Sequence, residues 1–165
     1  MTQQTELYRA TKDDIYLFKE GTNYRSYVLL GARVGLWNGI QGTRFSVWAP
    51  QASCVSVTGD FNDWNPMTHP MEPVAGSGIW ELFIPGVGEH RLYKYAVTDR
   101  AGKTVLKSDP YAFYSELRPS NASIVYTLEG YEWNDQKWQE EKRRTPLYDK
   151  PVSIYEVHLG SWKRK

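Results

Sequence analysis

Hydrophobic and polar residues alternate with a period of two through the middle of the chain. In residues 44–49 the apolar positions 45, 47 and 49 share a face, and in residues 53–58 Val55 and Val57 share one side. Similar alternation or strand-like composition marks residues 79–84, 92–98, 103–107 and 122–128. Because successive side chains of a strand point to opposite faces, each segment predicts a strand with one buried face.

Turn-forming residues separate these segments. Pro50 ends the first, residues 59–66 are dense in turn formers, residues 85–88 read Pro-Gly-Val-Gly, and residues 99–102 predict a hairpin turn. Short strands at this spacing, with no helical period between them, are typical of an antiparallel β-sandwich of about 100 residues. We therefore predict an all-β fold, with a sandwich over residues 25–130.

Short helical flanks are expected on both sides of the sandwich. Residues 1–24 form a polar lead segment whose apolar cluster, at 15–18, predicts one or two helical turns with Asp13 or Asp14 near the cap. Residues 131–150 read as a charged linker helix over about 134–144, capped by Asn134 and stopped by Pro146.

Residues 151–165 begin with a strongly apolar stretch, Val152 to Leu159, that predicts another strand. One interpretation is a last strand of the sandwich. The other is the truncated start of a second domain, since a strand that follows a linker has little here with which to pair.

Composition excludes some partners and favours others. The net charge of +1 gives no field for a polyanion, so nucleic acid is not expected as a partner. The aromatic fraction of 15%, with 7 Trp and 12 Tyr, suits carbohydrate or protein surfaces as well as a sandwich core. No apolar run has membrane-spanning length, the N-terminus lacks a signal-peptide core, and Cys54 is the single cysteine. These features predict a cytoplasmic protein with no membrane partner.

Catalytic signatures are missing from the sequence. His69, His90 and His158 lie far apart, without a second ligand at metal-site spacing, and no nucleotide-binding glycine motif is present. Asp60 and Asp63 lie among turn formers, where aspartate commonly caps its own backbone. We therefore expect no catalytic residue, metal site or cofactor, and predict a binding or docking domain.

Three motifs carry a resemblance to a known family. Residues 45–50 (FSVWAP), 59–64 (GDFNDW) and 93–95 (YKY) are similar in order and spacing to family-48 carbohydrate-binding modules, immunoglobulin-like sandwiches that precede many alpha-amylase superfamily enzymes. Residues 107–119 and 154–162 resemble bacterial 1,4-alpha-glucan branching enzymes of glycogen biosynthesis. In that family the second segment is the first strand of the catalytic (β/α)8 barrel.

The resemblance implies a function for the parent protein. A branching enzyme transfers α-1,4 glucan chains to 6-hydroxyls through a covalent intermediate, which requires two carboxyl groups on later barrel strands. The 165 residues would then be the N-terminal module, without those catalytic residues. Its expected partners are an α-glucan such as glycogen or a malto-oligosaccharide, and the catalytic barrel of its own parent chain.

The resemblance also implies three sugar-binding residues. The ring at Trp64 would stack on a glucose, while Lys94 and Asn121 would hydrogen-bond hydroxyls. A packing role for Trp64, and surface or turn roles for the other two, are the alternatives. Regulatory members carry a second stacking tryptophan, and residues 103–107 here offer no ring. That departure predicts that sugar binding is weak or located elsewhere.

Three other functions compete with this one. A stand-alone regulatory glycogen-binding subunit is disfavoured by residues 154–162, and the module of a debranching or trehalose-releasing hydrolase by residues 109–119. A sandwich used only for protein adhesion is disfavoured by the motif at 59–64, although a fold alone does not determine function.

Overall fold

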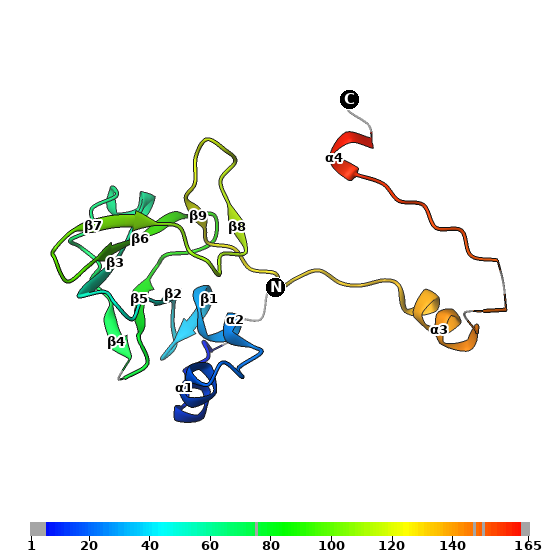
Figure 1. Ribbon diagram of the computed structural model, residues 1–165, viewed down its shortest axis with the longest axis horizontal. Coiled ribbons are helices and arrows are strands. Elements are labelled where there is room, and N and C mark those ends of the chain that lie inside the picture. Colours follow the sequence, from blue (N-terminus) through cyan, green and yellow to red (C-terminus); the bar gives the residue numbers. More distant parts are fainter. Residues whose placement is uncertain (1–5, 75, 147, 150, 163–165) are drawn as a thin grey trace. The chain divides into compact units, whose positions relative to one another are not determined.

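The computed structural model describes residues 6–74, 76–146, 148, 149 and 151–162 (Figure 1). The chain divides into two units, one reaching to Glu129 and one starting at Gly130. The first unit contains all the strands among the described residues, in two antiparallel sheets. The predicted all-β sandwich with short helical flanks is therefore confirmed.

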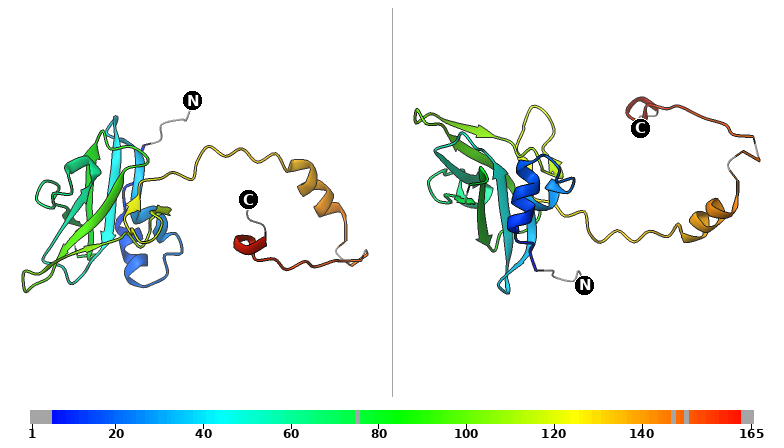
Figure 2. Two further views of the ribbon diagram at one scale, coloured as in Figure 1. Left: turned by 90° about the horizontal axis from the view of Figure 1, so that it is seen from above. Right: turned by 60° about the horizontal axis from the view of Figure 1, so that its bottom comes forward.

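The strands of each sheet come from segments far apart in the chain. The first sheet has the order β1 (Gly31–Trp37), β2 (Ile40–Trp48), β5 (Ile79–Pro85) and β4 (Glu72–Val74). The second has the order β3 (Cys54–Gly59), β6 (Leu92–Thr98), β9 (Ser123–Ile124) and β8 (Tyr114–Ser115), and β7 (Thr104–Lys107) also pairs with β6. Figure 2 shows the two layers from two further directions.

The core lies between the two sheets and follows the predicted alternation. Phe45 of β2, Val57 of β3 and Tyr95 of β6 are fully buried. The rings of Phe45 and Tyr93 cross the gap between the layers edge to face, with centroids 5.0 Å apart. Burial of each such side chain contributes about 1.5–3 kcal/mol, so this layer supplies most of the driving force for folding.

The hairpin of β1 and β2 extends the sheet beyond the predicted strands. The pattern predicted a strand only from about residue 44, whereas β2 begins at Ile40 and pairs along its length with β1. Asn38 and Gly39 connect the two strands with φ of 52° and 78°. An Asn-Gly pair is a strong hairpin signal because both residues tolerate positive φ, so the sequence did contain the information.

The strand expected over residues 122–128 is much shorter than predicted. Regular pairing covers Ser123 and Ile124, after which Val125 still donates its amide to the carbonyl of Arg91 at 2.9 Å. Beyond that point the segment leaves the ladder. The two-residue length reflects pairing with β6 on one side and the short β8 on the other.

The N-terminal helix begins earlier in the chain than predicted. Helix α1 (Lys12–Lys19) is capped by Thr11, not by Asp13 or Asp14. The Thr11 hydroxyl accepts from the Asp14 amide at 3.1 Å, and the Asp14 carboxylate accepts from the Thr11 amide at 2.8 Å. This reciprocal capping box satisfies two backbone donors, which explains why Thr11 is the cap.

Arg44 joins the N-terminal segment to the outer face of the first sheet. Its side chain is only 1% exposed, 3.4 Å from Glu81, and donates to the carbonyls of Tyr8 at 2.6 Å and Val28 at 2.8 Å. The second contact lies at α2 (Ser26–Leu29). Burial lowers the pKa of Arg44 and raises that of Glu81, and each shift is partly offset by the charge of the other residue. The residues before β1 therefore cover this face (Figure 2).

The second unit contains helices but no strand among its described residues. Helix α3 (Gln136–Arg144) follows Asp135 as its cap, not the predicted Asn134. The Asp135 carboxylate accepts from the Gln139 side chain at 2.9 Å but makes no capping bond to the helix backbone. Residues 151–158 have no regular secondary structure, and α4 (Leu159–Trp162) follows. The predicted strand over 152–159 is therefore not formed, because a strand requires a pairing partner and none of the described residues provides one.

Candidate functional site

The motif at residues 59–64 forms a tight loop at the end of β3. It contains a 3-10 turn, η1 (Asp60–Asn62), directly after Gly59. A Cβ on Gly59 would lie 2.2 Å from the carbonyl oxygen of Leu92, so only glycine fits there. Phe61 turns inward, with its ring centroid 6.0 Å from that of Phe45. The loop is thus anchored on the core.

Asn62 closes the loop and leaves Trp64 at the surface. Its side chain accepts from the Gly59 amide at 2.9 Å and donates to the Val57 carbonyl at 3.1 Å. Asp63 and Trp64 then both adopt left-handed backbone, with φ of 52° and 57°. The Trp64 amide donates to the Gly59 carbonyl at 2.9 Å, while its side chain is 37% exposed. The backbone of Trp64 is fixed and its ring is accessible.

Lys94 and Asn121 are brought together by the second sheet. Lys94 lies on β6 between the inward-facing Tyr93 and Tyr95, so its own side chain points to the outer face. Its ammonium group donates to the side-chain carbonyl of Asn121. The two residues are 27 positions apart in sequence, and this contact joins β6 to the loop before β9.

Trp64 is placed near this pair through the backbone. The carbonyl of Gly59 accepts from the Trp64 amide. Gly59 directly follows Thr58, which is the cross-strand partner of Lys94. Contacts of η1 with both β3 and β6 hold the loop at this end of the sheet. The structure therefore places all three predicted residues at one end of the β3–β6 pair, with a direct bond only between Lys94 and Asn121.

A buried polar network holds the Asn121 loop in place. Asp109 is buried and its carboxylate accepts from the hydroxyl of Tyr93 at 2.6 Å and from that of Tyr95 at 3.2 Å. The Asp109 amide donates to the Ser123 hydroxyl at 2.8 Å. Since Ser123 lies two residues after Asn121, the network ties the position of Asn121 to β6.

The network perturbs the ionisation of its members. Burial raises the pKa of Asp109, although the donated hydrogen bonds from Tyr93, Tyr111 and Tyr95 oppose this shift. Burial and the neighbouring Asp109 charge raise the pKa of both Tyr93 and Tyr95 well above the ordinary value. Both tyrosines thus stay protonated and act as donors, which gives this site a rigid base.

Sequence reasoning did not identify this network. The alternation of residues 92–98 predicted only that Tyr93 and Tyr95 share one face of a strand. A tyrosine hydroxyl on a buried face needs a polar partner, and this requirement could have prompted a search for one. Asp109 is the partner, 14 residues beyond Tyr95. Because Asp109 lies so far along the chain from the two tyrosines, no local pattern predicts that they pair.

The arrangement suits binding more than covalent chemistry. An exposed ring offers a stacking surface, and an ammonium with an amide offers directed hydrogen bonds. Within the described ranges, no group of three His, Cys, Asp or Glu side chains is placed to hold a metal ion. None of the helices in the described part of the chain has the length and hydrophobicity needed to cross a bilayer.

Two curated proteins are similar in sequence to most of this chain. The chain is 55% identical over 152 residues to the 1,4-alpha-glucan branching enzyme GlgB of Geobacillus stearothermophilus, covering 92% of this chain and 24% of that enzyme. It is 54% identical over 154 residues to the Bacillus subtilis enzyme of the same name, covering 93% of this chain and 25% of that enzyme. The chain thus spans about a quarter of the length of these curated relatives.

The fold has a solved counterpart as well. The crystal structure of apo pullulanase from Klebsiella pneumoniae matches with a TM-score of 0.52 and 27% identity, covering 72% of this chain and 12% of that one. Residues 29–112, which include β1 to β7, the Trp64 loop and Lys94, match the family described as carbohydrate-binding module 48 (isoamylase N-terminal domain). The chain belongs to the carbohydrate-binding module 48 family.

Proposed function

We propose that this chain is the N-terminal module of a 1,4-alpha-glucan branching enzyme and that it binds α-glucan through Trp64, Lys94 and Asn121. The observations that support the proposal are an exposed Trp64 on a hydrogen-bonded loop at the end of β3, and Lys94, on the neighbouring strand β6, bonded to Asn121. A glucose ring has apolar faces that stack on indole and hydroxyls that need fixed polar partners. The identity to two GlgB enzymes favours this function over a regulatory subunit or a debranching hydrolase.

The proposal extends to the parent reaction. The parent would cleave an α-1,4 linkage, form a glycosyl–enzyme intermediate on a carboxylate, and transfer the chain to a 6-hydroxyl. The module would then support and orient the catalytic barrel. Under this proposal, residues 25–130 are the module, 131–150 the linker, and 151–165 the start of the barrel. A cytoplasmic location remains a prediction from sequence.

Binding by this site is expected to be weak. Strand β7, where a second stacking ring would lie, carries only Thr104, Val105, Leu106 and Lys107. One ring supplies about 0.5–1.5 kcal/mol beyond its area burial, too little for tight binding without a second platform. Avidity along a polymer would then be the more effective route to glycogen.

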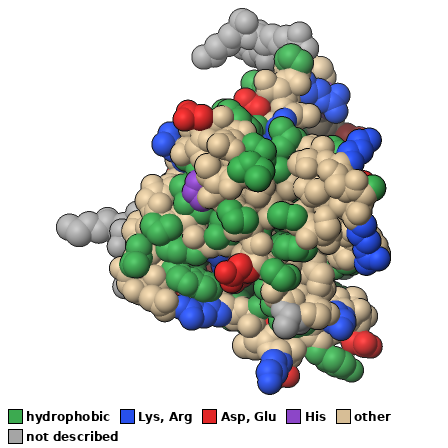
Figure 3. Space-filling view, turned by 90° about the vertical axis from the view of Figure 1, so that its left-hand side faces the viewer, with side chains coloured by type: hydrophobic (Ala, Val, Ile, Leu, Met, Phe, Trp, Pro, Cys, Tyr) green, Lys and Arg blue, Asp and Glu red, His purple; other side chains and the backbone are tan. Residues whose placement is uncertain are grey.

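The surface composition favours an uncharged ligand. Figure 3 shows one side of the sandwich, on which hydrophobic side chains gather over the middle and most basic side chains lie toward the margin. The net charge of the chain is +1. Such a surface lacks the concentrated basic field that attracts polyanions and is compatible with a neutral polysaccharide.

The test is a titration of isotope-labelled chain with maltoheptaose, followed in the amide spectrum, for wild type and Trp64→Ala. We expect the variant to lose about 1 kcal/mol of binding free energy with little change in its urea melt. Trp138→Ala, which removes an exposed tryptophan from α3, is the matched control and should bind as wild type. Unchanged sugar shifts in a strongly destabilised Trp64→Ala would assign Trp64 to packing instead.

A further inference from the structure

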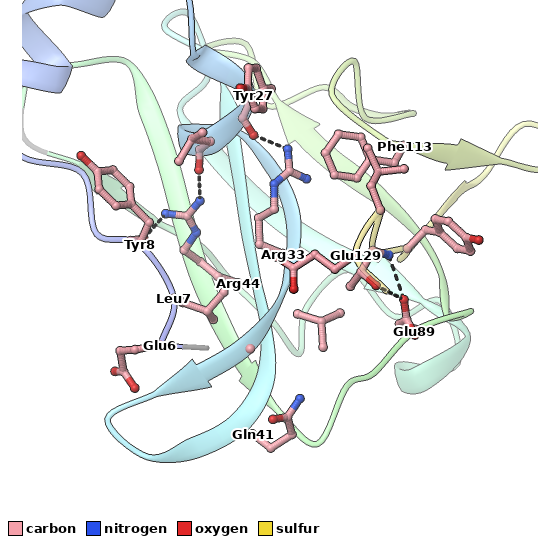
Figure 4. A pocket seen from close by; sticks show the side chains of 16 residues that line it. Glu6, Leu7, Tyr8, Tyr27, Arg33, Gln41, Arg44, Glu89, Phe113 and Glu129 are labelled. Atoms are coloured by element: carbon pink, nitrogen blue, oxygen red, sulfur yellow. Dashed lines mark hydrogen bonds between the residues drawn. The ribbon is translucent and has the colours of Figure 1, made fainter. Parts of the chain in front are cut away.

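A second concave surface lies apart from the three predicted residues. It is a pocket of about 560 Å³, within the range of about 300–1,000 Å³ that is typical of small-ligand sites (Figure 4). Its walls come from the N-terminal segment, α2, β1, β2, the loops that contain Glu89 and Phe113, and the segment that leaves β9. None of Trp64, Lys94 and Asn121 lines it.

Three aromatic side chains form part of its wall. Tyr27, Phe113 and Tyr126 line the pocket from separate segments and are 47%, 37% and 37% exposed. Rings that remain this accessible in a concavity provide stacking surface at low conformational cost. They come from positions 27 to 126, so only the folded chain assembles them.

Arg33 is held between the backbone carbonyl of Tyr27 and the ring of Phe113. Its guanidinium donates to the Ala32 carbonyl at 2.8 Å and to the Tyr27 carbonyl, and its Cζ lies 4.1 Å from the centroid of the Phe113 ring. Figure 4 shows its guanidinium beside the Phe113 ring and below Tyr27. Guanidinium carries five N–H donors, so some remain for a ligand after these bonds.

The charges around the pocket disfavour an anionic ligand. Glu6, Glu89 and Glu129 lie on its lining, against Arg33 and Arg44. Arg44 is already 3.4 Å from Glu81, outside the lining. The pocket therefore has no cationic excess for a phosphate or carboxylate.

The polar groups of the pocket wall suit a ligand that carries hydroxyl groups. The amide and hydroxyl of Thr127 both donate to Oε1 of Glu89, at 2.8 and 2.6 Å, and no described residue donates to Oε2. A carboxylate oxygen accepts from a sugar hydroxyl, and Arg33 donates to one. A purely apolar ligand would strip water from these groups without replacing its hydrogen bonds.

We infer that this pocket is a second α-glucan site, which takes a short stretch or an end of an α-1,4-linked chain. Stacking on Phe113 and Tyr126 would hold the sugar faces, and Arg33 and Glu89 would orient the hydroxyls. The choice of an α-glucan rests on the proposed function. Two sites on one small module would let it engage a branched polymer at two points, which raises avidity without tight individual contacts.

The test uses the whole 165-residue chain and maltotriose, with amide shifts read separately at the pocket and at the Trp64 loop. In Phe113→Ala we expect the dissociation constant from pocket signals to rise about tenfold, equivalent to about 1.4 kcal/mol. Tyr24→Ala removes a 91% exposed ring outside the pocket and is the matched control. Trp64→Ala should leave the pocket signals unchanged.

A second variant guards against misfolding of the first. Gln41 is exposed and lies at the opposite end of the pocket from Phe113 in Figure 4. Gln41→Trp should fill the pocket, keep the fold, and abolish sugar shifts there. Pocket amides that do not respond to maltotriose would overturn the inference and leave the concavity to a protein partner. Loss of response at the Trp64 loop alone would instead contradict the proposed function.

Discussion

Strand β2 and residues 151–158 have similar patterns and opposite outcomes. In β2, Phe45 and Val47 are 0% and 8% exposed, whereas Ile154 and Tyr155 are 90% and 71% exposed. Both segments read as apolar strands in sequence. Only β2 has neighbours on both sides, β1 and β5. A hydrophobic pattern thus specifies which face of a strand can be buried, whereas the strands that bury it come from other parts of the chain.

The two segments also differ in how much their side chains contribute to the stability of the fold. Full burial of a Phe or Val side chain contributes about 1.5–3 kcal/mol to stability. None of the described residues from Gly130 to Trp162 is buried. The second unit therefore adds little hydrophobic stabilisation of its own. Four predictions test this difference between buried and exposed segments.

The largest effect is expected in the core. Phe45→Ala should lower the free energy of unfolding by about 4 kcal/mol, because it opens a cavity beside Tyr93 and Phe61. The matched change Ile154→Ala should leave it within about 0.5 kcal/mol of wild type. Urea melts of both variants measure the contrast. A comparable loss in Ile154→Ala would contradict it.

The next largest effect concerns the buried charge that joins the N-terminal segment to the sheet. Arg44→Met should cost about 3 kcal/mol, since it leaves Glu81 and the carbonyls of Tyr8 and Val28 without their donor. Hydrogen exchange should accelerate in α1 as well as in β2. Arg100→Met, in the exposed hairpin turn, is the control and should have no measurable effect.

A smaller, pH-dependent effect is expected at Asp109. Burial raises its pKa in the folded chain above the ordinary value of 3.8, so the folded state binds more protons there than the unfolded state. The contribution of Asp109 to stability is therefore fully present below pH 3.8 and declines as pH rises through the folded pKa.

The comparison with Asp109→Asn isolates this contribution. The stability of wild type relative to the variant should fall as pH rises from about 4 to 7. Exposed carboxylates titrate equally in both proteins and cancel in the difference. Urea melts across this range provide the measurement, and a difference that stays constant or grows with pH would argue against a raised pKa.

The smallest effect compares the two helix caps. Thr11→Ala removes the capping box of α1 and should cost about 1 kcal/mol. Asp135 makes no side-chain capping bond at α3, so Asp135→Ala should change the helix content of the second unit very little. Circular dichroism and melts of both variants suffice. Equal losses would show that the caps are equivalent in solution.

Much of the sandwich could be predicted because its signals are local. The shared faces of Val55 with Val57 and of Tyr93 with Tyr95 follow from period-two alternation, and the structure buries all four side chains. The β1–β2 hairpin was missed although Asn38-Gly39 announces it. Helix caps differed from the prediction because several Thr, Asn and Asp residues compete near each helix end, and only backbone geometry selects one.

The candidate site was less accessible to sequence reasoning. The family motif identified Trp64, Lys94 and Asn121, and the bond between the latter two spans 27 residues. Nothing local indicated Asp109 as the partner of two tyrosines, or Arg44 as a buried contact for the N-terminal segment. Such pairings depend on chain topology, which the hydrophobic pattern does not encode.

The strand faces, the turn positions and the membership in a carbohydrate-binding module family follow from the amino-acid sequence alone, because they depend on side-chain period, turn chemistry and local motifs. The folded structure was needed to establish which strands are buried and which groups bind Arg44 and Asp109. It was also needed to establish that Phe113 and Arg33 line one pocket. The reason is physical. Burial and hydrogen-bond satisfaction are properties of surfaces that meet, and residues distant in sequence supply those surfaces.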